Sequence, residues 1–99
     1  MNPPCANCTD ARFPLGRVVI TPAASAALEA AAIPEVLLLA RHVRGDWGEL
    51  TEEDRLQNEL ALLLDLRVLS SYALPASGKV WVITEADRAA TTILLPDDY

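Results

Sequence analysis

The pattern of hydrophobic and polar positions divides the chain into a helical part followed by a strand part. A short β-branched run predicts a first strand at 17–20. The period is then helical, and it predicts helices at 23–33, at 35–44 and from Thr51 to about Asp65. From residue 67 the period is two, and the predicted strands are 67–74, 79–84 and 91–95. The expected fold is α+β, in the order β-α-α-α-β-β-β, with helices packed on one face of an antiparallel sheet.

Five residues mark where the predicted helices begin and end. Thr21 is a good N-cap, and the proline after it suits the first helical position. Pro34 ends the first helix and begins the second. Gly45 fits the left-handed residue that closes the second helix, and Thr51 fits the N-cap of the third. These signals predict three separate helices rather than one long one.

The third predicted helix carries its leucines and its acids on different faces. We expect the leucines to form the core face and the acids to face water. The leucines are Leu56, Leu60, Leu63 and Leu64, and the acids are Glu52, Glu53, Asp54 and Glu59. Asn58 lies off the leucine face, which predicts an exposed side chain.

Composition makes one small globular domain the expectation. The chain has 99 residues, of which 52% are hydrophobic and 22% charged, and this balance is too apolar for a disordered chain. We expect a flexible leader at 1–12 and a single domain at 13–99. No run approaches about 18 consecutive apolar residues, and the first residues lack the pattern of a signal peptide. We therefore expect a cytoplasmic protein that does not enter a membrane.

Charge and cysteine content narrow the expected ligands. The net charge of −6 argues against tight nonspecific binding to nucleic acid, but it leaves open a local basic site or a positively charged partner. Cys5 and Cys8 form one Cys-x-x-Cys pair, whereas a structural zinc site needs four ligands. We interpret them as incidental thiols, with a metal shared between chains or redox activity as the alternatives. No metal and no cofactor are expected.

The stretch Arg41–Gly48 concentrates the residues best suited to chemistry. It holds the only histidine, His42, near the end of a helix whose dipole favours imidazolium. A histidine poised near neutral pH suits acid–base catalysis; the alternative is a histidine packed at the helix end and bonded to the backbone. Arg41 and Asp46 flank it. Trp47 is either a plug of the core or a surface that stacks on a base or a partner side chain.

Polar residues of the predicted strands form a second candidate group. Its members are Ser71, Tyr72, Thr84, Arg88 and Thr92. Alternation places Ser70 and Tyr72 on one face of their strand and Ser71 on the other. The alternative to a functional site is turn chemistry, in which hydroxyls satisfy backbone groups and an exposed ion pair contributes little. The group joins the first one only if segment 84–92 folds back against 41–48.

Three motifs give the chain a resemblance to a known family. They are Arg41-His42-x-x-Gly45-Asp46-Trp47-Gly48, Trp81–Arg88 and Thr91–Pro96. Residues 13–99 resemble a family of small uncharacterised "plasmid-related" proteins of bacterial plasmids and integrative conjugative elements, which implies no established activity. The order of helices before strands is also distantly similar to the barnase/EndoU/colicin/RelE-like ribonuclease superfamily. That likeness implies RNA cleavage without a metal, by histidine, arginine and hydroxyl groups.

Two functional hypotheses follow from these features. We favour a non-catalytic interaction module of a mobile genetic element, an acidic inhibitor- or antitoxin-like protein that binds a host or element-encoded partner. The alternative is a metal-independent ribonuclease with His42 as acid or base. Its further roles would be phosphate binding by Arg41 or Arg88, base stacking by Trp47 and orientation of the scissile group by Thr92 or Ser71. A pocket that contains His42 favours the enzyme, whereas a buried His42 favours binding.

Overall fold

A single four-stranded sheet organises the protein, whose computed structural model describes residues 11–75 and 78–99. The strands are β1 (Arg17–Ile20), β2 (Val68–Ala73), β3 (Lys79–Thr84) and β4 (Ala90–Leu94). The helices are α2 (Pro22–Ala31), α3 (Glu35–Val43) and α4 (Glu52–Leu64), and a 3-10 turn, η1 (Pro96–Asp98), follows β4. The predicted α+β class and its β-α-α-α-β-β-β order are confirmed. Cys5, Cys8 and the centre of the β2–β3 turn lie outside the described residues.

The sheet is mixed, because its first strand joins it differently from the others. The strand order is β1-β4-β3-β2. The short connections from β2 to β3 and from β3 to β4 require antiparallel neighbours, as expected. The long helical connection after β1 allows it to pair in parallel with β4, and Arg17 lies opposite Ala90. The antiparallel meander is thus extended by one parallel edge strand.

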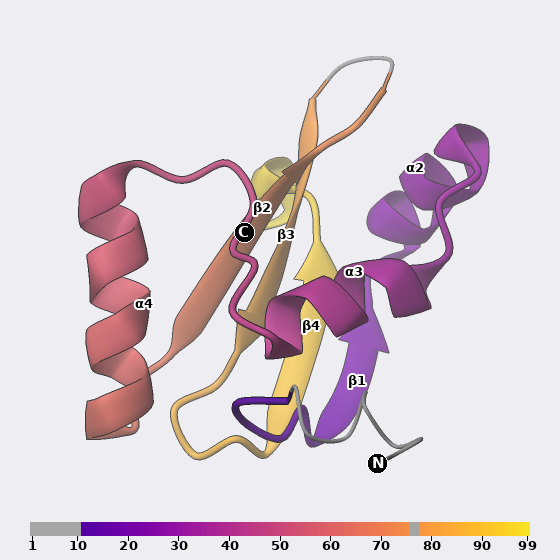
Figure 1. Cartoon of the computed structure of the whole chain (residues 1–99). Coiled ribbons are helices and arrows are strands. Elements are labelled where there is room, and N and C mark those ends of the chain that lie inside the picture. The colour runs from indigo at the N-terminus through magenta and orange to yellow at the C-terminus, as the bar shows by residue number, and fades with distance from the viewer. Residues whose placement is uncertain (1–10, 76–77) are drawn as a thin grey trace, which may run out of the picture.

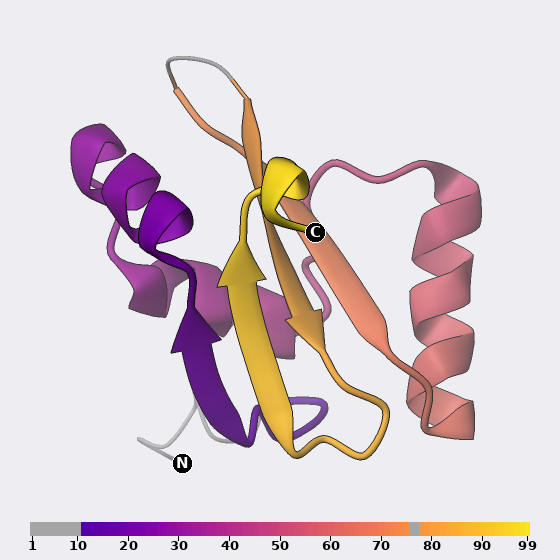
Figure 2. The same ribbon diagram turned by 180° about the vertical axis from the view of Figure 1, so that it is seen from behind.

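Helices α2 and α3 bury part of their apolar residues against one face of this sheet. In Figure 1 α3 crosses in front of the strands, α4 lies beside β2 and α2 lies beyond β1. The main core comprises Ala24, Leu28, Leu38, Tyr72, Val80, Val82 and Ile93, and a second cluster comprises Phe13, Trp47, Ala61 and Val68. On the opposite face, seen in Figure 2, η1 packs on β3, and the rings of Trp81 and Tyr99 meet edge to face at 5.9 Å.

The helix ends follow the predicted capping residues closely. The Thr21 hydroxyl accepts a hydrogen bond from the Ala24 N–H at 3.2 Å, and Gly45 has a φ of +88°. Helix α2 ends two residues earlier than predicted, because Ala32 already adopts a left-handed conformation (φ 57°). Within the described residues, no single helix is long and apolar enough to cross a membrane. Only α2 and α3 taken together, bent by 103°, have that length and composition.

The outer edge of β2 is paired with side-chain and loop groups instead of another strand. The Asn58 amide of α4 donates to the Leu69 carbonyl at 2.7 Å, and its oxygen accepts from the Leu69 N–H at 3.1 Å. The Ser71 N–H donates to the Trp47 carbonyl at 2.9 Å, and the Ser71 carbonyl accepts from the Glu49 N–H at 2.6 Å. The exposed position predicted for Asn58 is wrong, since only 5% of it is exposed.

Replacing Asn58 with leucine is expected to lower the free energy of unfolding by about 2 kcal/mol, because two partly buried backbone groups of Leu69 lose their partners. Gln57→Leu, on the neighbouring exposed position, should change it by less than about 0.5 kcal/mol. Urea unfolding measures both values, and amide exchange should accelerate at Leu69 in the first variant only. Equal stability of the two variants would show that Asn58 does not hold the strand edge.

The four predicted core leucines of α4 are exposed, and the prediction of a leucine core face is wrong. Between 48% and 79% of the surface of Leu56, Leu60, Leu63 and Leu64 is accessible to solvent. The helix instead turns Asn58 and Ala61 inward. The physical reason is the location of α4, which lies beside the edge of a strand rather than over the sheet. A strand edge presents N–H and C=O groups, and these need a polar partner more than an apolar one.

Candidate functional site

His42 is buried at the end of α3, on the helix-covered face of the sheet. It has no exposed surface, and both ring nitrogens are bonded to strand hydroxyls. The Nδ1 atom lies 2.6 Å from the Ser70 hydroxyl of β2, and Nε2 lies 2.9 Å from the Thr84 hydroxyl of β3. His42 thus joins a helix to two strands rather than facing a cavity.

The hydrogen bonds around His42 all run in the same direction, from donor to acceptor, and this fixes the tautomer of the imidazole. The Thr91 hydroxyl donates to the Leu15 carbonyl at 2.7 Å, since a carbonyl can only accept. Thr91 must therefore accept from the Thr84 hydroxyl, 2.7 Å away. Thr84 in turn accepts from Nε2–H of His42, and Nδ1 accepts from the Ser70 hydroxyl. When the imidazole is neutral, each of these hydrogen bonds has one donor and one acceptor.

The burial of His42 and its low pKa argue against the acid–base role considered from the sequence. Burial, and to a lesser degree the positive charge of Arg88, lowers the pKa of His42 from 6.5 to about 3. The imidazole is therefore neutral near pH 7, and solvent does not reach it. The expectation of a packed histidine at a helix end describes it better, with hydroxyls in place of a backbone carbonyl as its partners.

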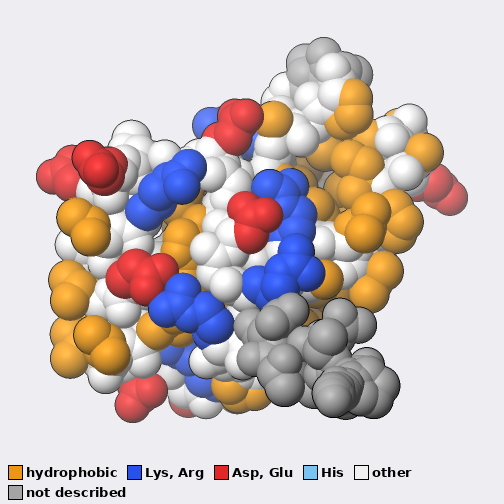
Figure 3. Space-filling model, viewed as in Figure 1, with side chains coloured by type: hydrophobic (Ala, Val, Ile, Leu, Met, Phe, Trp, Pro, Cys, Tyr) orange, Lys and Arg blue, Asp and Glu red, His pale blue; other side chains and the backbone are white. Residues whose placement is uncertain are grey.

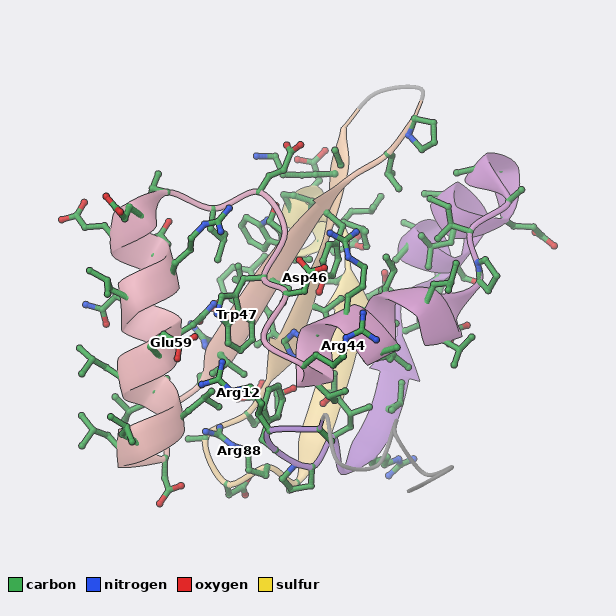
Figure 4. The ribbon with its side chains drawn as sticks, viewed as in Figure 1. Arg12, Arg44, Asp46, Trp47, Glu59 and Arg88 are labelled. Atoms are coloured by element: carbon green, nitrogen blue, oxygen red, sulfur yellow. The ribbon has the colours of Figure 1, made fainter. Side chains whose placement is uncertain are left out.

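Trp47 fills the space beside His42 and is itself buried. Its ring meets the imidazole edge to face at 5.8 Å and stacks on Phe13 at 6.2 Å. The indole N–H donates to Glu59 of α4 at 3.2 Å, and Glu59 forms an ion pair with Arg12 at 2.7 Å. Figure 4 shows Arg12, Trp47 and Glu59 converging between α4 and the 44–51 loop. Trp47 acts as a plug of the core, and its face is not free to stack on a base.

The two arginines considered for phosphate binding are already engaged. Arg88 donates to the backbone carbonyls of Leu66 (2.6 Å) and Ala61 (3.1 Å), at the C-terminal end of α4. Arg41 forms a bidentate pair with Asp46 at 2.8 and 3.2 Å, and the hydrogen bonds from Arg41 lower the pKa of Asp46. Both guanidinium groups therefore hold the protein's own segments together.

Tyr72 anchors the Arg41–Asp46 pair to the sheet. The Arg41 guanidinium lies 4.5 Å from the centre of the Tyr72 ring, and the Tyr72 hydroxyl donates to the Asp46 carbonyl at 2.7 Å. Burial raises the pKa of Tyr72 to about 12, so that its hydroxyl remains a donor at neutral pH. Asp46 and Tyr72 thus fix the loop after α3.

The structure brings some of the predicted site residues together and separates others. His42, Thr84 and Trp47 are in contact, and Arg88 lies close enough to affect the imidazole. Ser71 and Thr92 lie on the opposite face of the sheet and do not approach His42. The two partners that the predicted site did not include are Ser70 and Thr91. Strand alternation could have identified them, because it places each on the face opposite to Ser71 or Thr92.

A hollow of about 350 Å³, lined in part by Arg41, Asp46 and Tyr72, lies beside the loop after α3. The described residues also form two larger hollows, and none of the three is lined by His42, Arg88 or Thr92. One, of about 450 Å³, lies between the start of α4 and the open face of β2 and β3. The other, of about 470 Å³, runs between α3 and the β2–β3 hairpin. In the described part of the chain, no three His, Cys, Asp or Glu side chains are placed to hold a metal ion.

No family model, curated protein or solved structure matches the chain. Inference about function therefore rests on the geometry of the described residues. In the His42 region the imidazole is neutral, and Arg41 and Arg88 are both hydrogen-bonded to other groups of the protein. The leucine surface of α4, by contrast, is exposed and contacts no other part of the core within residues 11–75 and 78–99.

Proposed function

We propose that this protein is a non-catalytic interaction module that binds a protein partner through the leucine face of α4. The leucine face comprises Leu56, Leu60, Leu63 and Leu64. The observation that carries the proposal is the reversed amphipathicity of α4, with Asn58 and Ala61 inward and the leucines outward. A contiguous apolar surface on a folded chain marks an interface, because leaving it in water forgoes the free energy of burial.

The spacing of the leucine face supports docking of a helix into a groove. Leu56, Leu60 and Leu63 follow one another at i, i+4 and i+7, which places them in one stripe. In Figure 3 hydrophobic side chains follow the outer side of α4, away from the sheet. The binding site on the partner should therefore be an apolar groove about as wide as one helix.

The charges of α4 support a partner with a basic rim. Four acids and one arginine lie within the helix, namely Glu52, Glu53, Asp54, Arg55 and Glu59. Three of the acids occupy the first turn, beside one end of the leucine face. Together with the net charge of −6, they favour encounter with a positively charged surface.

In this proposal the partner is a protein of the kind that the resemblance to plasmid-related proteins implies. The protein acts in the cytoplasm as an inhibitor- or antitoxin-like component of a mobile genetic element, on a host or element-encoded protein. A ribonuclease function has no comparable support, since His42 is neutral and buried and the arginines near it are engaged.

The proposal is tested by replacing two exposed leucines with a charged residue. Leu60→Lys/Leu63→Lys should reduce recovery of the bound protein from a host lysate at least tenfold, with quantitative mass spectrometry as the readout. Val36→Lys, which changes an exposed aliphatic residue of α3, should leave recovery unchanged. All three proteins should have free energies of unfolding within about 0.5 kcal/mol of one another. Recovery that is equal for the double variant and the wild type would refute the role of the leucine face.

A further inference from the structure

We propose that the leucine face of α4 also binds a second copy of this chain, in the groove between α3 and the β2–β3 hairpin. This inference rests on the proposed function, because it assigns one occupant to the same docking surface. The two surfaces belong to different parts of the chain, so the contact joins copies head to tail. The groove and the helix match in their apolar character, in their length and in their charge.

The groove offers the apolar surface that the leucine face requires. It has a volume of about 470 Å³, and its lining includes Leu37, Leu38, Leu74 and Val80 together with Arg41 and Arg44. Leu37 is 55% exposed in its wall. The stripe from Leu56 to Leu63 spans about 10 Å along α4, and the nine residues of α3 span about 14 Å. The groove is therefore long enough to receive the leucine face.

Charge favours this groove over a second leucine face. Two α4 helices packed in parallel would oppose the three acids of their first turns, and two packed antiparallel would set those acids against a last turn that has no basic residue. The groove instead carries Arg41 and Arg44 on one side. Arg41 is paired with Asp46, whereas Arg44 has no acid within 4.0 Å among the residues that the structure describes. Arg44 can thus receive an acid from the first turn of α4 of the second copy.

The arrangement of the two surfaces prevents a chain from filling its own groove. Figures 1 and 2 both show α4 on one side of the molecule and α2 with α3 on the other. The contact therefore uses a different surface on each copy, and such heterologous contacts extend into rings or open chains. The extent of assembly should therefore rise with protein concentration.

A mixing experiment with two variants tests the head-to-tail contact. The face variant, Leu60→Lys/Leu63→Lys, keeps an intact groove; the groove variant, Leu37→Asp/Arg44→Glu, keeps an intact leucine face. Sedimentation equilibrium at about 100 µM, a concentration suited to weak contacts, should show assembly of the wild type and monomers of each variant alone. An equimolar mixture of the two variants should form a one-to-one dimer and nothing larger, because only one contact remains.

Three outcomes would overturn the inference. The first is a wild type that stays monomeric, and the second is a groove variant that still assembles alone, since α4 would then pair with α4. The third is a mixture that contains only monomers although both variants unfold with the wild-type free energy. If the wild type is monomeric but still captures another protein through its leucines, the self-contact fails while the proposed function stands. If assembly follows the predicted pattern but no other protein is captured, the self-contact stands alone.

Discussion

Lowering the pH from 7 to 5 is expected to reduce the free energy of unfolding by about 2 kcal/mol, through His42 alone. The folded pKa of about 3 lies below the ordinary value of 6.5, so that the unfolded chain takes up the proton first. The stabilisation is complete above pH 6.5 and is lost as the pH falls from there toward 3. The pKa values of Asp46 and Glu59 are also lowered, by their hydrogen bonds with arginine, so these carboxylates add a loss in the same direction at lower pH.

Urea unfolding at half-unit pH intervals measures this slope, which should approach about 1.4 kcal/mol per pH unit below pH 6. Because the chain has a single histidine, its proton NMR signal reports the folded state directly. That signal should stay at the neutral position at pH 5. The prediction fails if the imidazole titrates near pH 6.5 in the folded protein, or if stability is constant between pH 7 and 5.

Gly48→Ala is expected to lower the free energy of unfolding by about 4 kcal/mol, from backbone strain and a steric clash together. Gly48 has a φ of +77°, and an added Cβ would lie 2.0 Å from the Ser71 carbonyl oxygen. That oxygen accepts the hydrogen bond from the Glu49 N–H, so the clash would break the contact between the loop and the edge of β2. The side chain of Tyr72 closes the other side, 2.7 Å from the same Cβ position.

Gly78→Ala is the matched control for this substitution. Gly78 has nearly the same φ, +79°, but an added Cβ there would meet nothing within 4 Å. It should therefore cost only the conformational strain, about 1 kcal/mol. Thermal and urea unfolding of the two variants separate strain from clash. Equal losses would mean that the approach of Gly48 to the strand is looser than the structure indicates.

Local sequence signals predicted the helices and strands of this fold better than they predicted which elements pair with one another. The bounds of β1 and β3 agree with the predicted strands, and the Thr21 and Thr51 caps are confirmed, because these features depend on neighbouring residues. The parallel pairing of β1 with β4 joins residues about seventy positions apart, and no local pattern encodes it. The β-strand period nevertheless separated Ser70 from Ser71, and the structure places them on opposite faces.

The exposed face of α4 shows where periodicity stops being informative. A helical period of leucines predicts that one face is apolar, but not which neighbour that face meets. The location of α4 is decided by Asn58, whose amide pairs with the edge of β2. The surroundings of His42 were equally hard to predict, because its hydroxyl partners lie on strands and are 28 and 42 residues away in the sequence. Whether a histidine is catalytic or structural depends on those partners.

The chain of hydrogen bonds through His42 also gives the sheet a means of rejecting misaligned strands. Sliding β3 by two residues would keep the same face of the strand inward, so the alternation of side chains alone would not exclude the error. The slide would, however, bring Val82 or Ala86 to the place of Thr84 and leave Nε2–H of His42 without an acceptor. A buried donor left unpaired costs about 1–3 kcal/mol. One neutral histidine can thus help to select a single alignment among those that keep the same face of β3 inward.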